Sequence, residues 1–75
     1  MKPLPTQIEV FVWREPDGTP VRCMEKLKVL EENLIEIQEL CQEALEDAVL
    51  MGCDEDQARD VLRALADSLD KPFAD

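Results

Sequence analysis

The stretch MEKLKVLEENLIEIQELCQEALEDAVLM, residues 24–51, decides the fold of this chain of 75 residues. Apolar or small side chains recur in it at alternating spacings of three and four, which is the pattern of a helix with one apolar seam. The seam positions are Leu27, Leu30, Leu34, Ile37, Cys41, Ala44, Ala48 and Met51. The residues just off the seam, which widen the apolar face, are Ile35, Leu40, Leu45 and Val49. Because Gly52 follows, we predict one long helix over 24–51, about 28 residues or ~42 Å in length.

A second, shorter helix is predicted over 54–70. Asp54 is a suitable N-cap, and Gln57 three residues later completes the spacing of a capping box. The apolar stripe of this helix consists of Ala58, Val61, Leu62, Leu65 and Leu69. Pro72 cannot continue a helix, so residues 71–75 form a tail. The second helix has about 15 residues and reaches ~22 Å, so the two helices form an unequal hairpin.

The shorter helix covers only part of the longer one. The seam is small in its second half, at Cys41, Ala44 and Ala48, where the short helix can approach closely. The bulky half of the seam consists of Leu27, Leu30, Leu34 and Ile37. A chain of this size buries only ~60% of its unfolded surface, so a second copy is a common source of support. We therefore expect a homodimeric bundle, in which a second chain or the N-terminal segment covers the bulky half.

The residues before the long helix predict a first β-strand behind a flexible leader over 1–6. Over 7–13, aliphatic residues at even positions alternate with Glu9, Phe11 and Trp13 at odd positions. Aromatic and β-branched residues at a period of two are typical of a strand. Which face is buried stays open, because either the aliphatic or the aromatic side could pack on the helices.

A turn and a short second strand follow. Residues 15–19, Glu-Pro-Asp-Gly-Thr, have turn chemistry, and residues 19–23 return with Pro20 at an edge or bulge position. We therefore expect an α+β fold in a single domain, 1–75. It consists of a two-stranded β-hairpin over 7–23 followed by the helical hairpin.

The charge of the chain is strongly one-sided. Eighteen Asp and Glu face eight Lys and Arg, for a net charge of −10. From Val29 to Gln57 there are ten carboxylates and no lysine or arginine. Such a surface repels phosphate backbones and anionic lipid, and no apolar run approaches the ~20 residues of a membrane span. We expect no direct nucleic-acid or membrane partner. The acidic face is interpreted either as a solvated surface or as a docking face for a basic protein.

Side chains suited to catalysis or cofactor binding are scarce. The chain has no histidine, the usual general acid or base at neutral pH, and no tyrosine. Cys23, Cys41 and Cys53 form no CxxC pair and cannot build a closed disulfide framework. We therefore expect no enzyme activity, no metal and no cofactor. Unpaired thiols without an export signal predict a cytoplasmic location.

Together these patterns predict a non-enzymatic interaction protein, a bacterial-type accessory factor or adaptor. On the N-terminal segment, the predicted partner-binding residues are Phe11, Trp13 and Arg14, because aromatic residues with an arginine are typical of interface hot spots. On the long helix, they are the outward glutamates Glu32, Glu36, Glu39, Glu43 and Glu46. The predicted dimer seam is Leu27, Leu30, Leu34 and Ile37. The alternative hypothesis is a nucleic-acid mimic, whose carboxylate rows occupy the basic groove of a DNA- or RNA-binding protein.

Overall fold

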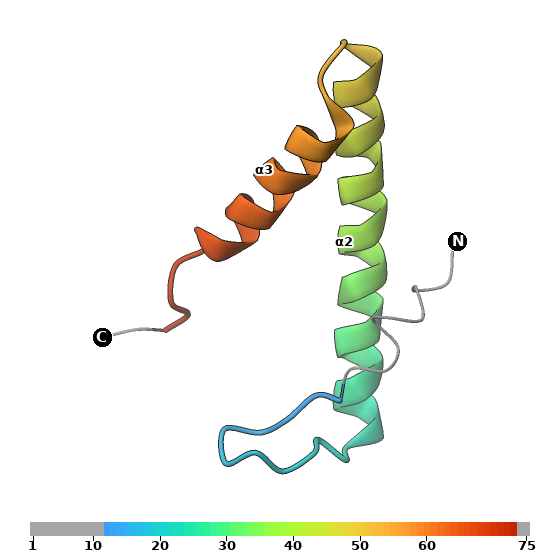
Figure 1. Ribbon diagram of the computed structural model, residues 1–75. Helices are drawn as coiled ribbons and strands as arrows, with labels where there is room; N and C mark the ends of the chain where they lie inside the picture. The colour runs from blue at the N-terminus through green and yellow to red at the C-terminus, as the bar shows by residue number, and fades with distance from the viewer. Residues whose placement is uncertain (1–11, 74–75) are drawn as a thin grey trace. The chain divides into compact units, whose positions relative to one another are not determined.

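The computed structural model describes residues 12–73, and among these it contains two α-helices and no β-strand (Figure 1). Helix α2 spans Met24–Leu50 and helix α3 spans Glu55–Asp67. The predicted helical hairpin is confirmed: α2 ends one residue before its predicted end, and α3 ends three residues before its own. The chain divides into two compact units, Met1–Leu40 and Cys41–Asp75, with the boundary inside α2.

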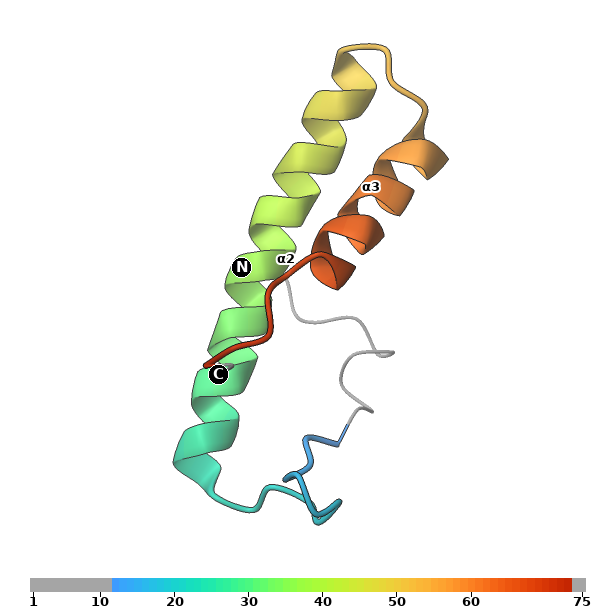
Figure 2. The same cartoon turned by 90° about the vertical axis from the view of Figure 1, so that its left-hand side faces the viewer.

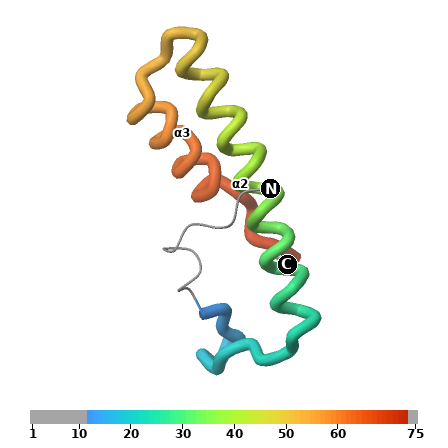
Figure 3. Tube along the Cα trace, turned by 90° about the vertical axis from the view of Figure 1, so that its right-hand side faces the viewer, coloured from blue at the N-terminus to red at the C-terminus, as the bar shows by residue number. Residues whose placement is uncertain are grey.

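The predicted α+β class and its N-terminal β-hairpin are wrong for the described residues. Over 12–23 the chain has a single antiparallel bridge, between Arg14 and Pro20, in place of two strands. In Figure 3 the blue end of the tube belongs to this segment, which turns back before it enters α2. The N–H of Val21 donates to the carbonyl of Trp13 at 2.8 Å, and no backbone bond in this part of the chain extends the ladder beyond it. The first half of the predicted strand, residues 7–11, lies outside the described residues.

The turn inside this segment does form as its residues predict. The N–H of Gly18 donates to the carbonyl of Glu15 at 2.8 Å, and the N–H of Glu15 donates to the carbonyl of Thr19 at 2.8 Å. Pro16 presets the first turn position, and Gly18 has a φ of 92°, as a three-residue hairpin loop with a left-handed third residue requires. The segment therefore has the turn of a hairpin without its strands.

The start of α2 explains why the return arm is so short. The carbonyl of Cys23 already accepts the N–H of Leu27 at 3.0 Å, so the backbone is committed to the helix two residues after Val21. Pro20 is not the cause. The hydrogen bonds on either side of the bridge make Arg14 and Pro20 a non-hydrogen-bonded pair. At such a position a backbone N–H would point away from the opposite residue, so proline, which has no N–H, loses no bond of the ladder there. A ribbon this short has little stability of its own in water.

Gly52 ends α2 in the left-handed conformation that the sequence favours, with a φ of 93°. The N–H of Gly52 donates to the carbonyl of Val49 at 3.0 Å, and the N–H of Cys53 donates to the carbonyl of Ala48 at 2.9 Å. These two bonds are the 5→2 and 6→1 pair of a Schellman motif, which satisfies helix-end carbonyls that have no partner in the helix. Figures 1 and 2 show α3 turning back from this corner beside the last turns of α2.

Asp54 begins α3 as the predicted N-cap. It has an extended backbone, with φ −68° and ψ 131°, and its Oδ2 accepts the N–H of Gln57 at 2.8 Å. The reciprocal bond of a capping box, from the Gln57 side chain to the Asp54 N–H, is not formed among the described residues. At the other end, the hydroxyl of Ser68 donates to the carbonyl of Leu65 at 2.7 Å and satisfies one of the last carbonyls.

The core of the corner lies at Leu45, which is 9% exposed and is the one buried apolar side chain among residues 12–73. The sequence placed Leu45 just off the seam and Ala44 on it, whereas Ala44 is exposed. The seam repeats every 3.5 residues, so on a straight helix it drifts by ~20° per heptad around the helix axis. The face of α2 that is packed therefore does not coincide with the seam positions along the whole helix. Two of its members, Cys41 and Ala48, are half-buried and lie four residues before and three after Leu45.

Candidate functional site

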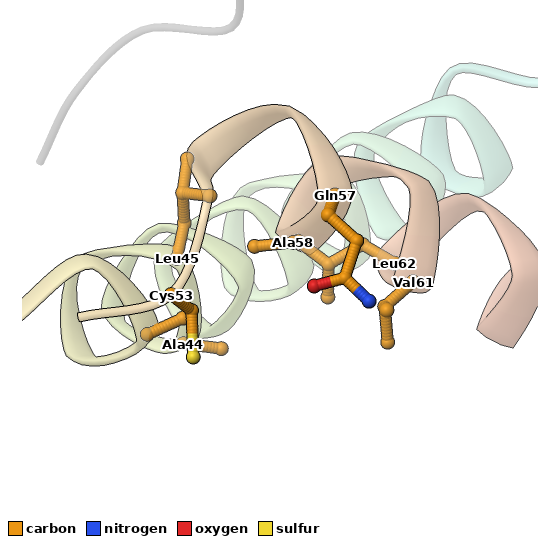
Figure 4. Close-up of a pocket in the computed structure, with 8 residues that line it drawn as sticks. Ala44, Leu45, Cys53, Gln57, Ala58, Val61 and Leu62 are labelled. Carbon is orange, nitrogen blue, oxygen red and sulfur yellow. The ribbon is translucent and has the colours of Figure 1, made fainter. Parts of the chain in front are cut away.

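The hollow in the unit Cys41–Asp75 is an open apolar groove at the helix corner, with a volume of ≈ 210 Å³ (Figure 4). Its lining residues are Ala44, Leu45, Ala48, Cys53, Gln57, Ala58, Val61 and Leu62. Seven of these are apolar or thiol side chains, and Gln57 is the one amide. A groove with this lining can exclude water from an apolar group but holds no set of polar atoms that would orient a reaction.

Burial separates the floor of the groove from its edges. Leu45 is buried, and Ala58 and Leu62 are half-buried, so these side chains form the floor. Ala44 on α2 and Gln57 and Val61 on α3 are exposed, so they form the edges. The small side chains along α2 keep the groove open, because a larger residue at Ala44 or Ala48 would fill the space between the helices.

Carboxylates immediately precede lining residues of the groove on both helices. Residues four apart lie on one face of a helix. The row formed by the residues that immediately precede them is turned by ~100° about the helix axis. On α2, Glu43 and Asp47 immediately precede the lining residues Ala44 and Ala48. On α3, the lining residues Gln57 and Val61 are likewise preceded by Asp56 and Asp60. These four acids are all exposed, and together they are termed the acidic border.

The arginines of α3 are already engaged within their own helix. The Arg59 Nε donates to Glu55 Oε2 at 3.1 Å, and the Arg63 Nη1 donates to Asp60 Oδ1 at 2.7 Å. Exposed pairs of this kind contribute only about 0.3–0.5 kcal/mol each to helix stability. The pairs engage both arginines of α3 together with two of its acids, one of which, Asp60, precedes the lining residue Val61.

The predicted acidic face is present on α2. Its five glutamates are all exposed, namely Glu32, Glu36, Glu39, Glu43 and Glu46. The Gln42 Nε2 donates to Glu46 Oε2 at 2.7 Å, one turn along the helix, and no lysine or arginine lies between Val29 and Gln57 to neutralise the row. Glu43 belongs both to this face and to the acidic border.

The predicted aromatic and arginine cluster is only partly described. Phe11 lies outside the described residues. Trp13 is exposed, but Arg14 turns into its own loop, where Nη1 donates to the carbonyl of Gly18 at 2.9 Å. In the same loop the Thr19 hydroxyl, and then the Thr19 N–H, lower the pKa of the Asp17 carboxyl by hydrogen bonding to it. This segment is a self-contained turn, and the described residues do not form an aromatic strand face.

The predicted dimer seam in the first half of α2 is partly covered. Leu27, Leu30 and Leu34 are half-buried, whereas Ile37 is exposed. None of the three reaches the burial of Leu45. The seam therefore retains exposed apolar surface, most of all at Ile37.

The thiols are free and differ in exposure. Cys23 and Cys53 are exposed at opposite ends of α2, whereas Cys41 is half-buried within the helix. Over residues 12–73 no group of three or more Cys, Asp or Glu side chains is placed to hold a metal ion. None of the described helices is long and apolar enough to cross a membrane.

In comparisons with known proteins, no family model matches the chain, and neither a curated protein nor a solved structure matches it. The groove and its acidic border were not predicted from the sequence. A signal for the groove was present, because small residues recur on the C-terminal half of the long helix. A signal for the border was present as well, because an acidic residue immediately precedes each of the lining residues Ala44, Ala48, Gln57 and Val61.

Proposed function

We propose that this chain is a non-enzymatic interaction protein, an adaptor or accessory factor whose fold is completed by another protein. The observation that carries the proposal is the lack of a closed core. Among residues 12–73 one apolar side chain is buried, while thirteen large apolar side chains are exposed. Large apolar surfaces that stay exposed in a single chain are often binding surfaces.

The acidic face of α2 supports a partner of basic character. A row of exposed carboxylates without an intervening cation raises the local concentration of positively charged surfaces and speeds their encounter. The glutamates Glu36, Glu39 and Glu43 lie at the centre of this row. Such a contact gives orientation and rate, whereas the exposed apolar side chains supply the buried area.

A second copy of the chain is the proposed cover for the seam Leu27, Leu30, Leu34 and Ile37. The first forty residues hold eight acids and five bases, so two copies repel one another less here than along the more acidic second half. Helices with an apolar stripe of this spacing associate into bundles.

The test is affinity capture of partners with the tagged full chain at low and high salt, beside the triple variant Glu36→Gln, Glu39→Gln and Glu43→Gln. We expect a stoichiometric partner that is retained at low salt, released at high salt, and weakened by the variant. A matched control, Glu25→Gln with Asp67→Gln and Asp70→Gln, removes three charges away from the row and should retain the partner. A soluble monomer that captures no protein at either salt concentration would contradict the proposal.

A further inference from the structure

We propose that the groove at the α2–α3 corner binds an amphipathic helix of a partner protein, with apolar residues on one face and lysine or arginine along both flanks. The inference rests on the proposed protein-binding function and names the chemistry of the partner. It concerns the groove of the unit Cys41–Asp75 and does not involve the seam of the first unit.

The shape of the groove favours a helix as the occupant. Its lining includes two residues four apart on each helix, Ala44 with Ala48 on α2 and Gln57 with Val61 on α3. Such rows are the ridges between which the side chains of a third helix pack. Leu45 and Leu62 supply an apolar floor, and a helix that enters a groove of this kind places residues i, i+3, i+4 and i+7 against it.

Charge favours a basic occupant over a second copy of the chain. The acidic border precedes lining residues on both helices, as Glu43 and Asp47 on α2 and as Asp56 and Asp60 on α3, of which Asp60 is paired with Arg63. Residues 41–75 hold ten acids against three bases, and the two ion pairs within α3 engage two of each, which leaves eight acids against one base. A second copy would bring the same acidic rows toward the groove, whereas lysines on both flanks of a helix would meet both rows.

The chain carries its own reporter for occupancy. Cys53 lines the groove and is exposed, whereas Cys23 is exposed and does not line it. A helix seated in the groove should protect Cys53 from a maleimide and leave Cys23 reactive. At a peptide concentration about five times its Kd, a fully protected thiol reacts about sixfold more slowly by mass action. Cys23 serves as the internal control in the same reaction.

The probe is a synthetic peptide of about 14 residues, two heptads long, with leucine at a heptad spacing and lysine at the flanking positions. Two control peptides are used with the full chain. One has the same composition in an order that spreads the leucines around the helix, and the other has glutamate in place of lysine. We expect protection of Cys53 by the amphipathic lysine peptide alone, and a loss of protection as salt screens the charges.

Two pairs of variants locate the binding. Val61→Asp places a charge on the groove edge and should abolish protection, whereas Val29→Asp, at a residue of the same exposure (55% against 56%), should not. Asp47→Asn with Asp56→Asn should weaken binding several-fold. Glu25→Gln with Glu31→Gln removes the same charge from exposed residues that neither line the groove nor adjoin a lining residue, and should have less effect. Far-UV circular dichroism confirms that each variant is folded.

Each contrary result overturns a distinct statement. Protection of Cys53 that rises with protein concentration in the absence of peptide would assign the groove to a second copy. Peptide binding that protects neither thiol would assign the peptide to the acidic face of α2. If affinity capture yields a partner and no peptide protects Cys53, the groove proposal fails while the proposed function remains. If capture also fails, both are overturned.

Discussion

Asp17 and Thr19 fix the loop before α2 through one carboxylate. The Thr19 hydroxyl lies 2.7 Å from Asp17 Oδ1, and the Thr19 N–H donates to the same oxygen at 3.0 Å. Both bonds favour the ionised carboxylate, so the pKa of Asp17 lies below its ordinary value. Because folding lowers the pKa of this carboxyl, its ionised form stabilises the folded loop at pH values above the unfolded pKa of ~3.9. This contribution is lost as the pH falls through the folded pKa.

Removing the hydroxyl should therefore raise the pKa of Asp17. In Thr19→Val the backbone bond remains and the side-chain bond, the larger cause, is lost, so we expect the pKa to return part of the way to its ordinary value. Thr19→Ser keeps the hydroxyl and should keep most of the shift. Carboxyl carbon chemical shifts, followed by NMR titration of the full chain from pH 2 to 6, measure the change directly. The same pKa in both variants would contradict the role of the hydroxyl.

Gly52 is the residue that allows the helix corner. Its φ of 93° is open to glycine, and a Cβ built there has no atom within 4 Å, so the cost of a side chain comes from the backbone alone. We expect Gly52→Ala to lower the free energy of unfolding by about 1 kcal/mol, and Gly52→Asn to lower it less, because asparagine tolerates the left-handed region. Urea unfolding followed by circular dichroism measures both. Equal losses would place the cost in packing.

At the scale of elements, Leu45 and Leu50 provide a matched pair on one helix. Leu45 is 9% exposed and forms the floor of the corner, whereas Leu50 is 84% exposed. Leu45→Ala removes buried methyl groups and should cost about 2–3 kcal/mol, the lower part of the range for buried leucine because the cover is thin. Leu50→Ala should change the free energy of unfolding by less than ~0.5 kcal/mol. Urea unfolding compares the two variants. If both cost the same, the packed face of α2 has been wrongly assigned.

The helices were predictable because their signals are local and repeated. Periodic apolar residues over 24–51, a glycine stop at Gly52 and the N-cap Asp54 each act within a few residues, and all three are found where expected. The β-hairpin prediction failed because alternation at a period of two shows only that a strand is compatible with the residues. Whether a ladder forms depends on the length of the return arm, and the early start of α2 leaves it too short.

The groove belongs to the whole corner and could not be predicted from either helix alone. Its floor depends on the rotation of α2 that buries Leu45 and exposes Ala44, and that rotation follows from the drift of the seam against the helical period. The acidic border follows from the same rotation, since it determines which carboxylates adjoin the edges. Composition predicted an acidic surface, but the lining of the packed corner is needed to see that Asp47 and Asp60 precede residues on the two helices of one groove.

Salt should separate the two kinds of association proposed for the whole molecule. Each chain carries a net charge of −10, so two copies repel, and screening that repulsion should strengthen a homodimer through the seam. A basic partner is attracted by the same charge, and screening should weaken that complex. Sedimentation equilibrium of the full chain at 20 mM and 500 mM salt, which correspond to Debye lengths of about 20 Å and 4 Å, measures the first effect. We expect tighter self-association at high salt, its loss in Ile37→Glu, and little change in the control Leu40→Glu, which is exposed and lies off the seam. A monomer at both salt concentrations would leave the seam to a different protein.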